Sequence, residues 1–192
     1  MGVTLSLIGI KETQSSILGL KDEEMDSESL DYIRSRYFLE QHLACVSFVL
    51  ELNYEGLYEL FNFQYDNSYT DIINYEERAY NRDRLREIGE EPKSKQALID
   101  DFEAKWQKLQ NNIGDVKELV NEFREAFKNE EEVMRRLSDT PTSIPGGYED
   151  LSPRQSFQKV LDMYGPEAFV EFSEALDILS ERGAVTVWLE EI

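Results

Sequence analysis

The fold class is decided by residues 98–137, which read LIDDFEAKWQKLQNNIGDVKELVNEFREAFKNEEEVMRRL. Apolar residues recur every three or four positions through this stretch, with one interruption at Gly114. That spacing places them on one face of a helix. Asp115, with Glu118 three residues later, is an acidic variant of the capping box that begins helices. We therefore predict a long helical hairpin over 93–138, in preference to a single long helix kinked at Gly114.

The segments on either side of the hairpin are also mainly helical in pattern. Ser152, Pro153 and Gln155 combine a cap, a first-turn proline and a capping-box glutamine, which indicates the start of a helix. Glycines follow several of the periodic segments and are typical helix ends. The pattern predicts helices over 27–52, 71–88, 153–164 and 166–182.

The segment 45–65 fits two structures. Apolar positions up to Leu50 step by four, three and four residues, which favours one continuous helix over 27–52. Residues 57–65 are also compatible with a strand, and the four residues 53–56 could close a hairpin. We expect the helix and leave the strand over 57–65 open.

Two short strands are predicted at the ends of the chain. Residues 3–10 alternate in part between apolar and polar side chains, and residues 184–189 are rich in β-branched and aromatic residues. We expect these terminal strands to pair. The predicted fold is therefore mainly α (α+β): a helical domain with a long helical hairpin and a small sheet formed by the terminal strands.

The expected organisation is one compact domain plus the hairpin. Residues 1–92 form an acidic N-terminal part with a strand, a buried helix, a tyrosine-rich segment and an arginine-striped helix. Residues 93–138 are the charge-balanced hairpin. Residues 139–192 comprise a linker, two helices and a C-terminal strand that packs back on the N-terminal part.

The chain is strongly acidic, since its 192 residues include 40 Asp and Glu against 20 Lys and Arg, a formal charge of −20. Such a surface repels nucleic-acid phosphates and anionic lipid, and no apolar run approaches the ~20 residues of a membrane span. With 41% hydrophobic and 11% aromatic residues, the composition excludes intrinsic disorder. The charge exceeds the roughly 2 to 8 that solubility requires, which favours a basic protein partner.

The surplus of acidic residues is unevenly distributed. The formal charge is −11 over residues 1–92, −1 over 93–138 and −8 over 139–192. Adaptation to salt would spread the charge evenly along the chain. The observed distribution instead indicates a directed acidic face outside the hairpin.

Few residues suit catalysis or metal binding. The single histidine, His42, and the single cysteine, Cys45, face the same side of a predicted helix, but a zinc site needs two further ligands. Phosphate-binding glycine loops and the calcium-loop spacing are absent from the sequence. We therefore expect a non-enzymatic protein with no catalytic residues, no metal and no cofactor. The lone cysteine excludes an internal disulfide and indicates a reducing, cytoplasmic setting.

A basic stripe lies within the acidic N-terminal part. Arg78, Arg82 and Arg86 recur every four residues on the helix predicted over 71–88. Arginine forks suit phosphate and carboxylate ligands, so the stripe is a candidate for anion binding. In so acidic a chain, the favoured interpretation is that the stripe contacts the protein's own acidic surface.

Six of the ten tyrosines lie within residues 54–80, interleaved with acidic residues. Tyrosine supplies a large contact area at low entropic cost and is enriched at interface hot spots. The alternative is that these rings fill an irregular core. If the segment binds a basic protein surface, the candidate partner-binding residues are Tyr54, Tyr58, Tyr65, Tyr69, Glu55, Glu59, Asp66 and Asp71.

Together, the charge and the tyrosines predict an acidic, non-enzymatic protein-binding module that occupies a basic, nucleic-acid-binding surface of a partner such as a nuclease. Nucleic-acid mimics of phage origin that inhibit restriction or CRISPR-type nucleases look similar in size and composition, as do immunity proteins for basic nuclease toxins. Two alternatives stay open. One is a structural protein that forms a homodimer through the hairpin, and the other is an enzyme that uses carboxylates with His42.

Overall fold

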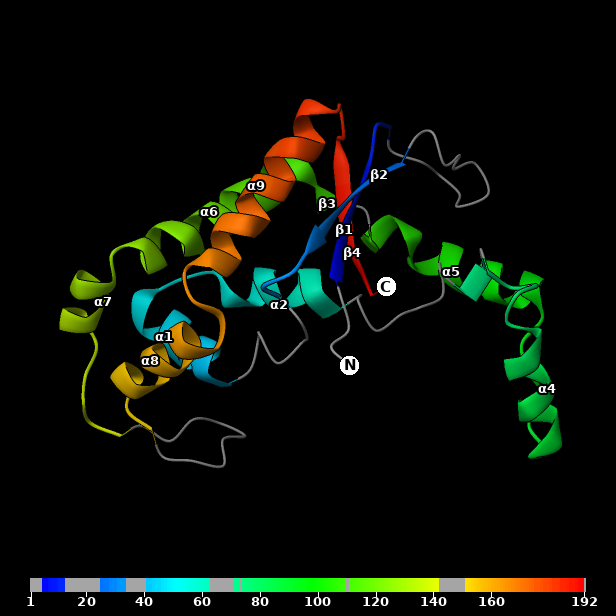
Figure 1. The fold of residues 1–192 in the computed structure, drawn as a ribbon, viewed down its shortest axis with the longest axis horizontal. Helices are drawn as coiled ribbons and strands as arrows, with labels where there is room; N and C mark the ends of the chain where they lie inside the picture. The colour runs from blue at the N-terminus through cyan, green and yellow to red at the C-terminus, as the bar shows by residue number, and fades with distance from the viewer. Residues whose placement is uncertain are drawn as a thin grey trace.

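The structure is a computed structural model, drawn in Figure 1. It describes residues 5–12, 25–33, 41–62, 71–72, 74–109, 111–141 and 151–191. The strands are β1 (Leu5–Ile10), β2 (Met25–Leu30), β3 (Asn111–Asn112) and β4 (Thr186–Glu191). The helices are α1 (Gln41–Leu50), α2 (Tyr54–Asn62), α4 (Ala79–Glu87), α5 (Lys95–Leu109), α6 (Ile113–Lys128), α7 (Glu130–Arg136), α8 (Pro153–Tyr164) and α9 (Glu167–Glu181). The predicted mainly α (α+β) class is confirmed.

The described strands form one antiparallel sheet in the order β2-β1-β4-β3. Leu5 at the start of β1 is opposite Leu30 of β2 on one side and Glu191 of β4 on the other. The predicted pairing of the two terminal strands is therefore confirmed. The strand β2 lies at one edge of this sheet, and the two-residue β3 lies at the other.

All six residues of the central strand β1 are buried. Because successive side chains of a strand point to opposite faces of the sheet, β1 is buried on both faces. Leu5 and Leu7 belong to the main core, whereas Ile8 and Ile10 belong to a second apolar cluster. Both faces of the sheet are covered, which explains why β1 is apolar at most positions.

The main core lies where α9 packs on α6 and β2, and where α1 packs on α8 (Figure 1). Phe169 of α9 has its ring centroid 5.5 Å from that of Phe123 and 4.9 Å from that of Phe127, both on α6. Aromatic pairs at such distances contribute about 0.5–1.5 kcal/mol each beyond their buried area. This core holds α1 and α2 in place, since their buried residues belong to it.

The second cluster joins α5 to the sheet. Ile99 and Phe102 of α5 are buried together with Ile8 and Trp188 of the sheet. From there α5 leads away from the sheet to α4, which has no buried residue and lies at one end of the molecule (Figure 1).

The helix predicted over 71–88 is wrong in part, because residues 74–78 form turns and α4 begins at Ala79, which leaves Arg78 before the helix. We call α4, with the turn residues 74–78 before it, the α4 arm.

The strand β1 and the C-terminal end of α9 approach each other closely at Gly9. A Cβ atom at this position would lie 2.8 Å from the Cβ of Ala184 and 3.3 Å from a methyl carbon of Leu179. A larger residue would force the helix away from the sheet, so close packing requires glycine here.

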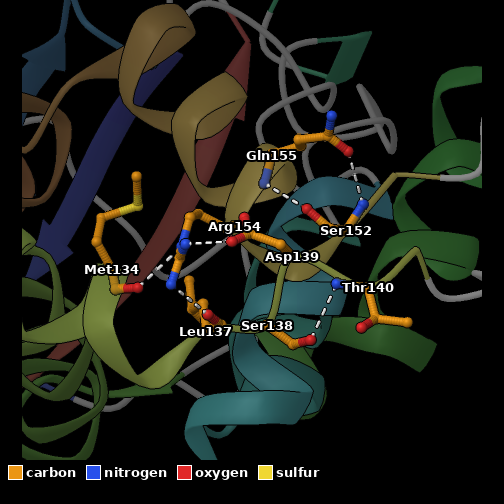
Figure 2. A network of polar contacts seen from close by, with 8 residues as sticks. All are labelled: Met134, Leu137, Ser138, Asp139, Thr140, Ser152, Arg154 and Gln155. Atoms are coloured by element: carbon orange, nitrogen blue, oxygen red, sulfur yellow. Dashed lines mark hydrogen bonds and ion pairs between the residues drawn. The ribbon is translucent and has the colours of Figure 1, made fainter.

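Arg154 connects the end of α7 to the start of α8 (Figure 2). Its Nε donates to the carbonyl of Met134 and its Nη2 to that of Leu137, each at 3.0 Å, and its Nη1 pairs with Asp139. These bonds satisfy carbonyl groups that the end of a helix leaves without partners. We call the contacts of Arg154 with Met134, Leu137 and Asp139 the Arg154 clamp. The capping box predicted at Ser152 is also present.

The helix predicted over 27–52 is wrong in its first part. Residues 25–30 form β2, and the described helix α1 covers Gln41–Leu50. Residues 34–40 of the predicted helix lie outside the described residues. All six residues of β2 lie opposite residues of β1, and Leu30 is buried in the main core. Pairing with a buried strand outweighs the weak local preference of this polar segment.

The strand considered over 57–65 is wrong for its described part, because Tyr54–Asn62 form α2. The four residues 53–56, which could have closed a β-hairpin, are instead the start of this helix. The Oδ1 of Asn53 accepts a hydrogen bond from the backbone N–H of Gly56 at 3.0 Å, as a helix cap does. Residues 63–65 lie outside the described residues.

The two helices of the predicted hairpin pack on different parts of the chain. Between α5, which ends at Leu109, and α6, which begins at Ile113, lies β3. The side chain of Asn112 caps α6 by accepting from the N–H groups of Gly114 and Asp115 at 2.8 and 3.3 Å, so Gly114 lies inside α6. The apolar face of α6 is buried in the main core, and α5 joins the second cluster. The part that extends furthest from the core is the α4 arm (Figure 1).

Candidate partner-binding site

The candidate site is the turn from α1 to α2, residues 48–59, which we call the α1–α2 corner. The last turn of α1 ends at Glu51, whose φ of 58° is left-handed. The N–H of Leu52 donates to the carbonyl of Ser47 at 2.9 Å, which closes the helix end in the manner of a Schellman motif. Glycine normally occupies this position, and another residue there costs roughly 1–2 kcal/mol.

The inner side of the corner is fixed by burial. Leu57, Leu60 and Phe61 of α2 are buried in the main core, and the ring of Phe61 meets that of Phe172 edge-on at 6.0 Å. With these positions turned inward, the outer side of α2 presents residues 55, 58 and 59 to solvent.

The outer side of the corner combines aromatic and acidic side chains. Phe48 of α1 is 87% exposed, the largest fraction for any large apolar side chain among the described residues, and Tyr58 is 48% exposed. Glu51, Glu55 and Glu59 are also exposed. The surface of the corner therefore offers large rings together with carboxylates.

Of the two predicted tyrosines in the corner, one is accessible and the other supports it. The ring of Tyr54 is partly buried against the main core. Its centroid lies 6.0 Å from that of Tyr58, with 35° between the ring planes. Tyr54 thus limits the positions that the Tyr58 ring can take, which lowers the entropy lost when Tyr58 binds a partner.

The electrostatic character of the corner is uniform. Residues 37–77 contain eight Asp and Glu and no Lys or Arg. Within the described part of the chain, Glu51, Glu55 and Glu59 form no ion pair. The corner therefore has a negative potential that no cation of its own segment offsets.

The remaining predicted partner-binding residues are either outside the described part of the chain or paired within it. Tyr65, Asp66 and Tyr69 lie outside the described residues. Asp71 is partly buried and forms an ion pair with Arg78. Its carboxylate is therefore already neutralised within the chain.

The three arginines of the predicted anion-binding stripe all have partners in the α4 arm or beside it. Arg78 pairs with Asp71, and the Nη1 of Arg86 lies 2.8 Å from the Oδ1 of Asp83. The guanidinium carbon of Arg82 lies 3.8 Å from the ring centroid of Tyr75, and its Nη1 donates to the carbonyl of the same residue. The interpretation that the stripe contacts the protein's own residues fits this geometry better than an open anion clamp does.

Sequence reasoning missed Phe48 and Glu51. Phe48 lies in the mostly apolar segment 43–50, in which it does not stand out, yet it lies off the stripe formed by Leu43, Val46 and Leu50. A helical wheel would have placed it on the opposite face. Nothing in the sequence signals the left-handed backbone at Glu51.

His42 and Cys45 lie one turn apart on α1, and both are partly buried. Among the described residues, no group of three or more His, Cys, Asp or Glu is arranged to hold a metal ion. Nor does that part of the chain contain a helix of the length and apolar character needed to cross a membrane.

Comparison of the chain with family models, with curated proteins and with solved structures found no match.

Proposed function

We propose that this chain is a non-enzymatic binding protein that occupies a basic surface of another protein through its α1–α2 corner. The observation that carries the proposal is that Glu51, Glu55, Tyr58 and Glu59, close together in the chain, are all exposed, and that the three carboxylates have no neutralising cation in the described part of the chain. Complementary charge accelerates encounter, and buried rings slow release.

The chemistry of the corner supports a protein partner. Carboxylates recognise Lys and Arg and repel phosphate, so a nucleic acid is a poor ligand for this face. A basic surface that normally binds nucleic acid suits it well. An inhibitor of a nuclease, as a nucleic-acid mimic or an immunity protein acting in the cytoplasm, is the most specific form of this proposal.

Self-association through residues 95–137 has less support. The apolar face of α6 is already buried against α9 and the sheet, so it is not available to a second copy. Two copies meeting at the α1–α2 corner would oppose their carboxylates, and like-charge contacts cost several kcal/mol.

The proposal is tested with a fluorescent lysine–alanine peptide of about 18 residues, which forms roughly five helical turns. Its affinity is measured by anisotropy for the wild type and for the combined variant Glu51→Gln, Glu55→Gln and Glu59→Gln. We expect the variant to bind about tenfold more weakly, because three exposed charge contacts contribute about 0.2–1 kcal/mol each. Raising the salt concentration from about 0.05 to 0.5 M should weaken the wild type more than this variant.

The matched control is the combined variant Glu122→Gln, Glu174→Gln and Glu181→Gln, which changes the net charge equally at exposed positions of α6 and α9. It should bind within about twofold of the wild type, since its changes lie outside the corner. Equal weakening of both variants would mean that the peptide responds only to net charge. That result would contradict a binding site at the corner.

A further inference from the structure

We infer that Phe48 is the anchor of the binding face and that its partner is a basic amphipathic helix. This inference rests on the proposed function and specifies its partner. The exposed fraction of Phe48, 87%, exceeds that of every other large apolar side chain in the described part of the molecule. Phe48 lies three residues before Glu51 in the chain, and aromatic rings, Phe included, are enriched in the buried centre of protein interfaces.

The local backbone keeps Phe48 in this position. The helix α1 is held by Leu43, Val46 and Leu50, which are buried in the main core on its other side. Phe48 therefore cannot turn inward unless α1 leaves the core. Its ring reaches an apolar environment only in a complex.

The spacing of the carboxylates matches a helix. Glu55 and Glu59 are four residues apart on α2, one turn or about 6 Å along its axis. Lys or Arg residues at every fourth position of a partner helix recur at the same interval. Such a helix with an apolar stripe beside its cations would pair with the carboxylates and cover Phe48 at once.

A second copy of the chain does not fit this description. The segment 37–77 contains no Lys or Arg, so copies meeting at their corners would place carboxylate against carboxylate. On the α4 arm, Arg78, Arg82 and Arg86 have partners within their own chain, so among the described residues of the arm Arg84 is left as a single open cation and the arm of a second copy offers no row of cations. The partner is therefore a different protein.

The test compares two helical peptides with lysines at the same positions, one with leucine and one with alanine on the opposite face. Wild-type protein should bind the leucine peptide at least about tenfold more tightly, because burying an exposed Phe ring is worth roughly 1.5–3 kcal/mol. Phe48→Ala should remove this preference and leave the affinity for the alanine peptide nearly unchanged. Circular dichroism checks that the variant is folded, as expected for an exposed helical site.

Tyr80→Ala is the matched control, since Tyr80 is a 76% exposed aromatic residue on α4. It should keep the full preference for the leucine peptide. If the wild type binds both peptides equally, or if Phe48→Ala keeps the preference, the anchor inference is wrong while the basic-partner proposal stands. If the wild type binds neither peptide at low salt, the proposed function itself fails.

Discussion

The α1–α2 corner and the α4 arm are both exposed, charged and rich in tyrosine, yet they use their charges differently. In the arm, Arg86 pairs with Asp83, Arg78 pairs with Asp71 just before the arm, and Arg82 packs on the ring of Tyr75. In the corner, the described carboxylates have no such partners. A charged side chain that forms an ion pair within the chain contributes to structure. A charged side chain without such a partner is available to bind another protein.

The difference also appears in the apolar residues. The inner faces of α1 and α2 belong to the main core, so the helices that carry the exposed rings of the corner are held in fixed positions. The arm has no buried residue in α4 and depends on its side-chain contacts. Rigid presentation reduces the entropy lost on binding, which favours the corner as the binding face.

The largest change in the free energy of unfolding is expected at the Arg154 clamp. A substitution there shows how much a charge that is paired within the chain contributes to stability. Arg154→Ala leaves the carbonyls of Met134 and Leu137 without their donor and should lower the free energy of unfolding by about 2–3 kcal/mol. Arg154→Lys should not restore it fully, because one ammonium cannot match a planar fork. Urea unfolding measures the loss. A change below about 0.5 kcal/mol would show that internal pairing is as dispensable as an open surface charge.

A smaller, local effect is expected in the arm. Arg82→Ala removes the contact with the Tyr75 ring and should lower local stability by about 1 kcal/mol. Because α4 is not packed in the core, the change should appear as faster amide exchange over residues 79–87. Arg84→Ala, at an exposed position of the same helix, is the control. Equal acceleration in both variants would remove the distinction between paired and open charges in the arm.

In the α1–α2 corner, a substitution at the turn should raise the free energy of unfolding, whereas the substitutions at Arg154 and Arg82 lower stability. Glu51→Gly relieves the left-handed backbone and should raise the free energy of unfolding by about 0.5–1 kcal/mol. The same variant should weaken binding of the basic peptide, since it removes one carboxylate. A gain in thermal stability together with a loss of affinity is the expected signature. Loss of both would indicate that Glu51 stabilises the fold.

The smallest stability effect is expected for the combined Gln variant of Glu51, Glu55 and Glu59. These carboxylates repel one another and have no partner in the described part of the chain, so stability should change by less than about 0.5 kcal/mol. Thermal unfolding at low and high salt measures it. A marked loss of stability would show that these carboxylates, like the Arg154 clamp, stabilise the fold, and would contradict their assignment as charges open to a partner.

Local sequence signals predicted much of the fold. Strong periodicity gave the helices around Phe123 and Phe172, and the cap at Ser152 and the stop at Gly89 lie where their chemistry requires them. Two features depended on tertiary contacts instead. Residues 25–30 form a strand because β1 offers a buried edge, and α5 and α6 part because their apolar faces meet different clusters.

The sequence predicted the chemical character of the candidate site, which combines tyrosines and glutamates, but not which of its side chains are exposed. The interleaved tyrosines and glutamates pointed to α2, where Tyr58, Glu55 and Glu59 are exposed. Which rings are accessible depends on burial, and the sequence pattern did not separate Tyr54 from Tyr58. Phe48 was missed because α1 is apolar on nearly every face, which suggests burial all round, although a helical wheel separates it from the stripe of Leu43, Val46 and Leu50.

The most direct test of the account is amide hydrogen exchange of the wild-type chain with and without the lysine–leucine peptide. If the corner is the binding face, slower exchange should appear in residues 44–62, while residues 79–87 of the arm and the exposed side of α9 stay unchanged. Protection spread over α9 and the arm to the same degree as over the corner would contradict the account.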